Sequence, residues 1–337
     1  MLTSDFNYHL PPELIAQTPA EPRDSSRLLI VDRKTGTLLH KRFFDLGEFL
    51  QAGDLLVLNE TKVFKARLHA RLENPSSLIE IFLLRPTHDN WIALAKPGRK
   101  LKPGTVLQFE DGQKATIKEK RGDGTIVIDF KKSTEAIFSW VESIGKVPLP
   151  PYIDPQLGTR HSEIGTIYQT VYAKHSGSVA APTAGFHFTK ELIEKLKSQG
   201  VNFATITLHV GLGTFRPIKT DKIEDHVMHE EWIDVPDSTR AAIRATRARG
   251  GRVIAVGTTT VRALESGINQ GFTNIFITPG YEFKIVDALI TNFHLPKSTL
   301  LVLVSALAGR DLILKAYAEA IEKNYRFYSF GDAMLIQ

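Results

Sequence analysis

The chain of 337 residues changes its hydrophobic period twice, and this pattern limits the folds that it can form. Six short alternating runs fill residues 64–130 and are separated by turn sequences such as PGRKLKPG and RGDG. On both sides of that stretch, apolar runs of strand length occur together with helix-like segments. Short alternating strands predict a small antiparallel barrel, whereas strands that alternate with helices predict parallel pairing. We therefore expect an α/β domain with a small inserted β-barrel.

The domain boundaries follow from the same pattern. The segment KVPLPPYIDP ends the strand-rich stretch, because it is too rich in proline to continue a strand or a helix. We expect residues 1–62 and 148–337 to form the α/β domain and residues 63–147 to form the inserted barrel.

Capping residues and turn signals mark further elements of the α/β part. Thr189 is the expected N-cap of a helix that Gly200 closes, and Asp237 begins a second helix. We also expect a hairpin at 26–44, a short helix at 45–51, strands at 54–59, 201–210, 252–257, 274–280, 288–293 and 333–336, and helices at 296–307 and 311–324.

Four apolar segments end in Gly, Thr, Asn or His, the residue types that hold polar ligands. They are residues 178–189, 208–216, 253–262 and 290–299. In α/β proteins the carboxyl ends of the strands surround the ligand crevice, so these segments should converge on one polar pocket. This convergence predicts an enzyme.

Composition excludes several classes of site. The chain has no cysteine, which excludes disulfides, thiolate metal sites and cysteine nucleophiles. The first residues, MLTSDFNYHLPPELI, lack a basic segment followed by an apolar core, and no run approaches the ~20 apolar residues of a membrane span. We expect a soluble, cytoplasmic protein with no membrane partner.

The positive charge is concentrated in the predicted insert. Residues 62–147 contain 16 Lys and Arg against 10 Asp and Glu, whereas the rest of the chain contains 26 against 27. Clusters occur at KVFKARLHAR, KPGRKLKPG and KEKR. A basic stripe attracts a phosphate backbone, although charge alone favours the simpler interpretation of a solvated basic surface.

The segment HVMHEE contains His226, His229 and Glu231. Two imidazoles three residues apart would share a helix face and could hold a metal with Glu231, but a third ligand in a zinc-site frame is not evident. Polar site residues or a hydrogen-bonded structural cluster are the alternatives.

The segment GTTTVR, residues 257–262, follows a strand and opens a helix. Its N–H groups and hydroxyls could receive an anion or a carboxylate, and the alternative is that Thr258 only caps the helix. The segment lacks the glycine spacing of a dinucleotide fingerprint and the GK[ST] of a Walker loop, so a phosphate cofactor is not supported.

His187 and His209 each lie between apolar neighbours, where a lone histidine is more often a core residue than a catalytic one. Small and polar neighbours such as Thr183 and Gly185 favour contact with a ligand. Ser178 and Ser305 occur in no nucleophile motif, so a serine hydrolase is not supported.

Ordered blocks of sequence extend over nearly the whole chain, among them LAKPGRKLK, VPLPPYI, GSVAAPTAGFHFT, LHVGLGTFRP, HVMHEE, TNFHLPKSTLL and YRFYSFGDAMLI. These blocks resemble the S-adenosylmethionine:tRNA ribosyltransferase-isomerase family of queuosine biosynthesis. Phe186 stands where leucine is expected in that family, and NETKV stands where aspartate and arginine are commoner.

The resemblance implies an α/β barrel with an inserted β-barrel and a specific reaction. Such enzymes transfer and rearrange the ribosyl part of S-adenosylmethionine onto the aminomethyl group of a 7-deazaguanine at the tRNA wobble position. The products are epoxyqueuosine in the tRNA, adenine and methionine. S-adenosylmethionine is then a consumed substrate, with no metal or other cofactor, and the partner is a tRNA with a GUN-type anticodon that carries the precursor base. The oligomeric state stays open, with a monomer as the working expectation.

Roles for individual residues follow from the resemblance and from the need for proton transfer. The expected catalytic residues are His187, His209, His226, His229, Glu231 and Asp332. The expected substrate-binding residues are Arg23, Arg27, Asn59, Thr183, Gly185, Phe186, Gly211, Gly213, Thr214, Arg216, Thr258, Thr259, Arg262, Asn292 and His294. In the basic insert, Arg99, Lys100 and Lys102 are expected to bind tRNA.

Two rival functions remain from the sequence. A non-catalytic RNA-binding protein would explain the basic insert but not the polar strand ends. A metal-dependent hydrolase built on His226, His229 and Glu231 is the second rival.

Overall fold

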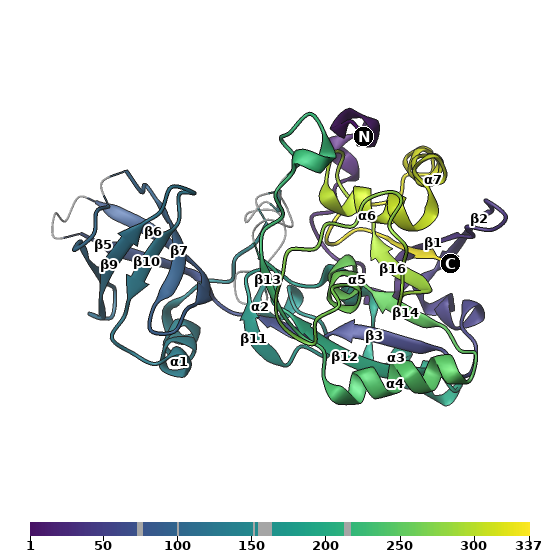
Figure 1. The fold of residues 1–337 in the computed structure, drawn as a ribbon, viewed down its shortest axis with the longest axis horizontal. Coiled ribbons are helices and arrows are strands. Elements are labelled where there is room, and N and C mark those ends of the chain that lie inside the picture. The colour runs from purple at the N-terminus through teal and green to yellow at the C-terminus, as the bar shows by residue number, and fades with distance from the viewer. Residues whose placement is uncertain (73–76, 100, 151, 154–163, 212–216) are drawn as a thin grey trace. The chain divides into compact units, whose positions relative to one another are not determined.

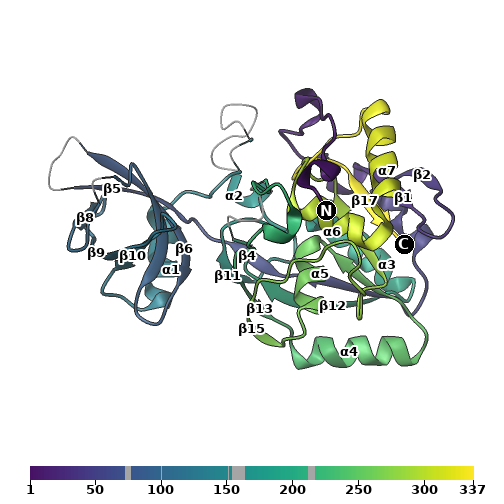
Figure 2. The same ribbon diagram turned by 45° about the horizontal axis from the view of Figure 1, so that its top comes forward.

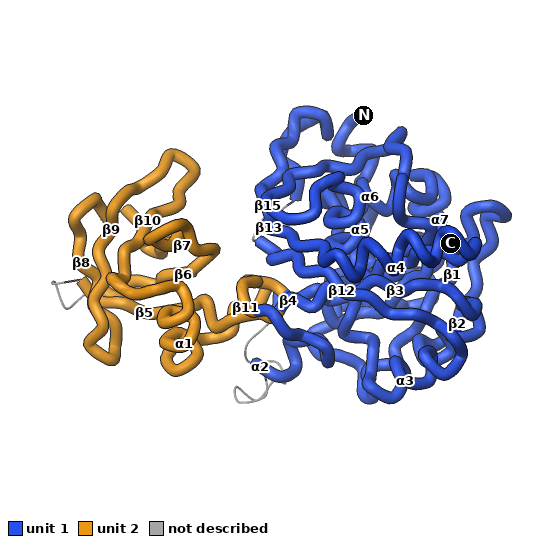
Figure 3. The backbone as a smooth tube through the Cα atoms, turned by 60° about the horizontal axis from the view of Figure 1, so that its bottom comes forward, with its two compact units in different colours: residues 1–61, 151–175, 181–337 blue, residues 62–150, 176–180 orange. Residues whose placement is uncertain are grey.

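The computed structural model describes residues 1–72, 77–99, 101–150, 152–153, 164–211 and 217–337. The chain divides into two compact units (Figure 3). Unit 1 comprises residues 1–61, 151–175 and 181–337, and unit 2 comprises residues 62–150 and 176–180.

Unit 1 is built on a nine-stranded mixed sheet with the order β15-β13-β12-β3-β14-β16-β17-β1-β2. Figure 1 shows its central strands β12, β3 and β14. In that order the strands are β15 (Gln270–Thr273), β13 (Glu231–Asp234), β12 (Asn202–Leu208), β3 (Leu55–Asn59), β14 (Val253–Val256), β16 (Ala288–Asn292), β17 (Ala333–Ile336), β1 (Arg27–Val31) and β2 (Leu38–Arg42).

The centre of this sheet is parallel, as the alternation of strands and helices predicts. β12, β3, β14 and β16 all run in the same direction, and Val57 of β3 lies between Ala204 of β12 and Ala255 of β14. β17 is antiparallel to β16 and parallel to β1, and β1 forms the expected hairpin with β2.

The described strands of unit 1 do not show the α/β barrel that the resemblance implies. A barrel needs its two outer strands to pair with each other, but β15 and β2 end the order, and within the described ranges neither has a second neighbour. The α/β class itself is confirmed.

Buried apolar side chains explain why the central strands form. Every residue of β3, β14 and β16 is buried, as expected for strands covered on both faces. On one face, Leu56, Leu58 and Ile254 join a core cluster that includes Leu192 and Leu196 of α3 (Lys190–Ser198).

The other helices of unit 1 are α2 (Ile164–Ile167), α4 (Asp237–Ala248), α5 (Thr258–Glu265), α6 (Thr299–Ala308) and α7 (Arg310–Glu322). Both α4 and α5 contact β12, β3 and β14, and Figures 1 and 2 show α4 alongside β12. The predicted N-cap of α3 is present, because Thr189 Oγ1 accepts a hydrogen bond from Leu192 N, and α4 begins at Asp237 as expected.

Unit 2 contains the predicted barrel, closed in the order β10-β7-β6-β5-β8-β9. Its strands are β5 (Arg67–Arg71), β6 (Leu78–Pro86), β7 (Trp91–Lys96), β8 (Val106–Phe109), β9 (Lys114–Lys120) and β10 (Ile126–Asp129). All six neighbouring pairs are antiparallel. A separate two-stranded sheet pairs β4 (Thr61–Val63) with β11 (His175–Ser178).

Several elements differ from the sequence prediction, which also did not include β4, β11, β13, β15 or α2. Unit 2 also contains α1 (Thr134–Ile144), whose Trp140 packs on Phe109 and Phe130; the sequence interpretation missed this helix. The expected strand at 274–280 is wrong, because β13 begins at Glu231, opposite Thr273, and offers no partner beyond that point. The expected helix at 45–51 is a 3₁₀ helix at Phe43–Phe49.

No helix within the described ranges combines the length and the apolar composition that crossing a bilayer requires.

The starts of β3 and β14 are joined by a buried carboxylate, which gives a testable prediction about stability. Both oxygens of Asp54 accept hydrogen bonds from the Arg252 guanidinium, at 3.2 and 2.6 Å. Burial raises the pKa of Asp54, but the bonds from Arg252 and from the Gln51 and Arg252 amides outweigh this effect, so the pKa lies below its ordinary value. Asp54→Asn should therefore lower the free energy of unfolding at pH 7 by about 2 kcal/mol.

Urea unfolding between pH 7 and pH 3 tests this expectation. Because the pKa is lowered in the folded state, the stabilising effect is present above pH ~4 and is lost at lower pH. The difference between wild type and Asp54→Asn should shrink below pH ~4. An equal difference at pH 7 and pH 3 would contradict the assignment.

Candidate active site

The carboxyl ends of three parallel strands meet at one edge of the sheet. β3 ends on Asn59, β14 is followed by Gly257, and β16 ends on Asn292. A cavity of about 40 Å³ lies there, and residues from all four predicted segments line it. The lining consists of residues 181–184, Val210, residues 257–259, residues 291–294, Leu300, Tyr328 and Ser329.

The size and lining of this cavity limit what it can hold. A volume of about 40 Å³ accommodates a small polar group or a few water molecules, not a whole nucleoside. Its described lining contains hydroxyl, amide, imidazole and apolar groups and no Asp, Glu, Lys or Arg. The cavity is therefore an uncharged polar recess at the strand ends.

Gly257 allows the chain to turn from β14 into α5. Its φ of +91° lies in the left-handed region, where a residue with Cβ would be strained. This turn places Thr258 and Thr259 on the cavity lining. The cap residue of α5 is Gly257, so the interpretation that Thr258 only caps the helix is wrong.

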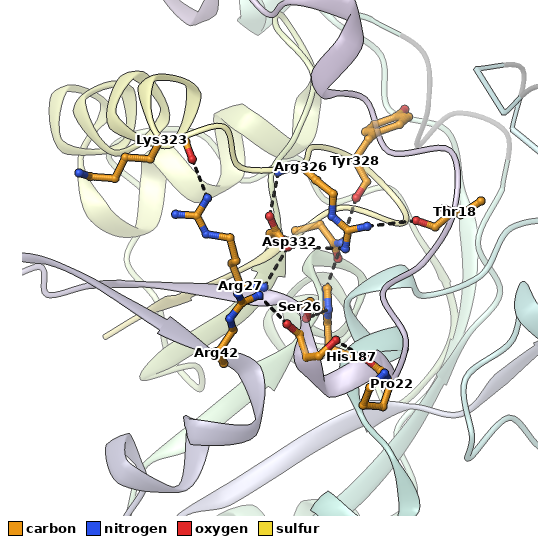
Figure 4. Close-up of polar contacts among 12 residues, drawn as sticks. Thr18, Pro22, Ser26, Arg27, Arg42, His187, Lys323, Arg326, Tyr328 and Asp332 are labelled. Carbon is orange, nitrogen blue, oxygen red and sulfur yellow. Dashed lines mark hydrogen bonds and ion pairs between the residues drawn. The ribbon is translucent and has the colours of Figure 1, made fainter.

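His187 is buried, and both of its ring nitrogens are hydrogen bonded (Figure 4). Nδ1 lies 2.7 Å from Ser26 Oγ, and Nε2 lies 3.2 Å from Asn292 Nδ2. Burial, with the nearby charges of Arg326 and Arg23, lowers the pKa of His187 to about 3. The imidazole is therefore neutral, with Nδ1–H donating to Ser26 and Nε2 accepting from Asn292.

His209 and His294 are also neutral near pH 7. Burial, with a smaller effect of His175, lowers the pKa of His209 to about 4, and burial lowers that of His294 to about 3. His209 Nδ1 and Thr61 Oγ1 are 2.9 Å apart, and the ring stacks on Trp232. His294 lines the cavity, with Nε2 2.9 Å from Thr291 Oγ1.

Glu231 and Arg262 form a buried ion pair beside the end of β12. Arg262 Nη1 donates to Glu231 Oε2, and Gly211 N donates to Glu231 Oε1 at 3.0 Å. Nε and Nη2 of Arg262 are buried and have no hydrogen-bond partner within the described ranges. Arg262 is thus held by Glu231 while two of its nitrogens keep unused donor capacity.

Asp332 organises a turn against β1 (Figure 4). Its Oδ1 accepts from Arg27 N at 2.9 Å, and its Oδ2 accepts from Arg326 N at 2.8 Å. The Arg27 guanidinium donates to Lys323 O and lies 3.6 Å from the centre of the Tyr325 ring. These contacts place Asp332 and Arg27 in the support of the site, outside the cavity lining.

Asn59 extends the pairing of β3 with β12 beyond the last backbone bond. Its Oδ1 accepts from Leu208 N and Thr61 N, and its Nδ2 donates to Leu208 O. A further bond of 3.4 Å joins Nδ2 to Thr259 Oγ1. Asn59 therefore ties the end of β12 to the start of α5, next to the cavity-lining residues Val210 and Thr259.

Arg23, Gly185 and Phe186 do not line the cavity; Gly185 and Phe186 directly follow its lining residues 181–184 in the chain. The Arg23 guanidinium donates to Gln169 O at 2.7 Å and to Ile167 O at 2.9 Å, and it lies 5.5 Å from the Phe186 ring centre. A Cβ at Gly185 would lie 2.0 Å from the Tyr172 hydroxyl, so only glycine fits. Thr183 from the same segment lines the cavity.

His226 and His229 do not lie on a helix. They fall in an irregular stretch before β13, where His226 is half-buried against Phe276 and His229 is exposed. Glu231 starts β13 and faces Arg262. No group of three His, Cys, Asp or Glu that could hold a metal ion occurs in the part of the chain that the structure describes.

Some predicted residues cannot be placed, and some lining residues were missed. Gly213, Thr214, Arg216 and Lys100 lie outside the described residues. The sequence interpretation missed Thr291, Tyr328 and Ser329, which line the cavity. The blocks TNFHLPKSTLL and YRFYSFGDAMLI were the available signal for them.

A family model described as "Queuosine biosynthesis protein" matches residues 3–336. The chain belongs to the queuosine biosynthesis protein family.

A curated protein and a crystal structure both match this queuosine biosynthesis family member over almost its whole length. The curated S-adenosylmethionine:tRNA ribosyltransferase-isomerase of Thermotoga maritima is 51% identical over 344 aligned positions, covering 100% of both chains. A crystal structure of S-adenosylmethionine tRNA ribosyltransferase from Thermotoga maritima matches with a TM-score of 0.57 and 42% identity, covering 99% of this chain and 100% of that one.

Among the histidines that the structure describes, His187 and His294 are the most deeply buried, and their burial predicts steep acid destabilisation. Because the pKa of His187 and of His294 is about 3 in the folded state, the unfolded state binds their protons first as the pH falls below ~6.5. Each histidine should lower the free energy of unfolding by about 1.4 kcal/mol per pH unit between pH ~6 and pH ~4.

Urea unfolding at half-unit steps of pH measures this slope. His294→Gln should remove about half of the contribution, whereas His88→Ala, at a side chain that is 95% exposed, should leave the slope unchanged. A wild-type slope close to zero between pH 6 and pH 5 would show that these imidazoles are not held neutral.

Proposed function

We propose that this chain is an S-adenosylmethionine:tRNA ribosyltransferase-isomerase. The observation that carries the proposal is the 51% identity, over the full length of both chains, to a curated protein of that name. The chain would transfer and isomerise the ribosyl part of S-adenosylmethionine onto the aminomethyl-7-deazaguanine of tRNA, giving epoxyqueuosine. A cytoplasmic location stays a prediction from the sequence.

The chemistry of this reaction defines what the site must supply. The sulfonium makes the C5′ hydrogens of the ribose acidic, so a base can remove one of them. Loss of this proton supplies the electron pair that lets adenine leave, the substrate amine adds to the ribosyl group and gives up a proton, and a ribosyl oxygen closes the epoxide at C5′ as methionine leaves with the C–S bond electrons. The protein must therefore move protons and exclude water around the ribose.

Among the predicted catalytic residues, we assign proton removal to His209. Its Nδ1 is held by Thr61, and its Nε2 makes no hydrogen bond with the described residues. By contrast, both nitrogens of His187 and both oxygens of Asp332 are hydrogen bonded within the protein. We assign His187 and Asp332 to positioning.

We also propose that the Arg262 guanidinium binds the methionine carboxylate. Two of its nitrogens are buried without a partner within the described ranges, and a buried donor without a partner is costly. Glu231 holds the guanidinium through the third nitrogen. A carboxylate on the two unpaired nitrogens would complete the hydrogen bonding of Arg262.

The exposed turn after β7 is the proposed tRNA contact in unit 2. Arg99 and Lys102 are exposed on this turn, and Lys120 from β9 donates to Gly98 O at 2.9 Å within it. Cationic side chains on an exposed turn can bind phosphates without reading the base sequence.

Release of adenine tests the function directly. Wild-type protein incubated with S-adenosylmethionine and tRNA carrying the precursor base should release one adenine and one methionine per modified tRNA. His209→Ala should lower the rate by about 10²-fold or more, because it removes the proton acceptor. His88→Ala is the matched control at an exposed histidine of unit 2.

tRNA with guanine in place of the precursor should give no adenine. If the wild-type protein binds precursor tRNA and releases no adenine, the non-catalytic RNA-binding alternative is correct. A metal-dependent reaction would instead stop on treatment with a chelator, and we expect full activity there.

Neutralising the basic turn tests the tRNA contact. We expect Arg99→Gln and Lys102→Gln, and also Lys100→Gln outside the described residues, to weaken binding of every tRNA to a similar degree. Each lost phosphate contact should reduce the slope of log affinity against log salt by about 0.7 to 0.9.

Affinity should be measured by filter binding at several salt concentrations, with Lys315→Gln on α7 as the control because Lys315 is an exposed lysine of unit 1. If a variant that carries all three substitutions keeps the affinity and the salt dependence of wild type, the phosphate contacts lie elsewhere.

A further inference from the structure

One buried acceptor at the cavity has no hydrogen-bond partner among the described residues. Asn292 is 3% exposed and lines the cavity, and its Oδ1 is buried without a hydrogen bond within the described ranges. An unpaired buried carbonyl oxygen costs about 1 to 3 kcal/mol. Such an atom at a ligand site points to a donor that the ligand brings.

The orientation of the Asn292 amide is fixed by its other contacts. Nδ2 donates to Tyr328 O at 3.0 Å and to His187 Nε2 at 3.2 Å. A flipped amide would place Oδ1 against the Tyr328 carbonyl, which can only accept. Oδ1 is therefore the end of the amide that is left for the ligand.

His187 and Tyr328, which fix the orientation of the Asn292 amide, are themselves held in place by other contacts. The neutral His187 ring accepts from Asn292, donates to Ser26 and stacks on Phe43 at 5.0 Å. Tyr328 has a φ of +75°, a strained conformation for a residue with a side chain, and its N–H donates to Phe293 O. The strained turn and the buried ring together present two acceptors to one amide.

The lining selects the chemical class of the donor. Since the described lining contains no carboxylate, an ammonium group would enter the recess without a counter-charge. A neutral O–H or N–H donor enters at lower cost. In S-adenosylmethionine the neutral donors are the ribose hydroxyls and the adenine amino group.

We propose that Asn292 is a specificity-determining residue whose Oδ1 accepts a hydrogen bond from a neutral donor of the adenosyl part of S-adenosylmethionine. His187 is then a positioning residue, which acts by holding the Asn292 amide. This inference rests on the proposed function, and it assigns the recess to the adenosyl part of S-adenosylmethionine.

Binding of analogues that lack single donors tests the inference. Dissociation constants are measured by calorimetry for S-adenosylmethionine and its 2′-deoxy, 3′-deoxy and 6-desamino analogues. Saturating tRNA with guanine in place of the precursor is present, so that no turnover consumes the ligand. One analogue should bind wild-type protein about tenfold or more weakly, because it leaves Oδ1 unpaired. The group that this analogue lacks, a ribose hydroxyl or the adenine amino group, is then the donor to Oδ1.

Variants then assign the effect to the amide. Asn292→Ala should bind S-adenosylmethionine about tenfold or more weakly and should no longer distinguish it from that analogue, while it still distinguishes the other two as wild type does. His187→Phe should lose the same discrimination. His187→Gln should retain it, because the glutamine carbonyl can accept from Asn292 Nδ2. Circular dichroism and thermal melting establish that each variant is folded.

Two results would overturn the role of Asn292. One is wild-type protein that binds all three analogues within twofold of S-adenosylmethionine, a result that does not depend on any variant being folded. The other is a folded Asn292→Ala protein that discriminates as wild type does. If adenine release is normal in either case, only this inference fails; if wild type neither binds S-adenosylmethionine nor releases adenine, the proposed function fails with it.

Discussion

The parallel alignment of β12, β3, β14 and β16 is the constraint on which the site depends. Because these strands run in one direction, their carboxyl ends lie at one edge, and segments far apart in the chain meet there. Asn59 extends the alignment through its side-chain bonds to Leu208, and Asp54 with Arg252 secures the opposite ends of β3 and β14. A shift of one strand would separate the groups that line the recess.

Burial of polar groups at this edge of the sheet determines their protonation states and their hydrogen-bonding roles. His187 and His294 are neutral because burial disfavours the imidazolium, so they serve as hydrogen-bond acceptors or neutral donors near pH 7. Arg262 remains paired with Glu231, and Asn292 is oriented by His187 and the Tyr328 carbonyl. The site therefore has a preorganised set of donors and acceptors, and Arg262 and Asn292 keep buried atoms without a hydrogen-bond partner within the described ranges.

The local sequence signals predicted elements better than roles. Hydrophobic period and capping placed the six barrel strands, the helix after Thr189 and the central strands, because these features depend on neighbouring residues. The strand at 274–280 failed because pairing depends on where β13 begins, which no local pattern encodes. Polar strand ends indicated Thr258, Thr259 and Asn292, but they could not show that His187 and Asp332 are occupied by protein partners.

By itself, the sequence determined the α/β class, the presence of a small antiparallel barrel and the segments that supply the site, since periodicity and composition are local properties. Tertiary structure alone decided that the main sheet is mixed and that Tyr328 and Ser329 join the recess. It also decided which polar atoms stay unpaired. Hydrogen-bond partners such as His187 and Asn292 lie 105 positions apart, and only folding brings one to satisfy the other and leaves Oδ1 open.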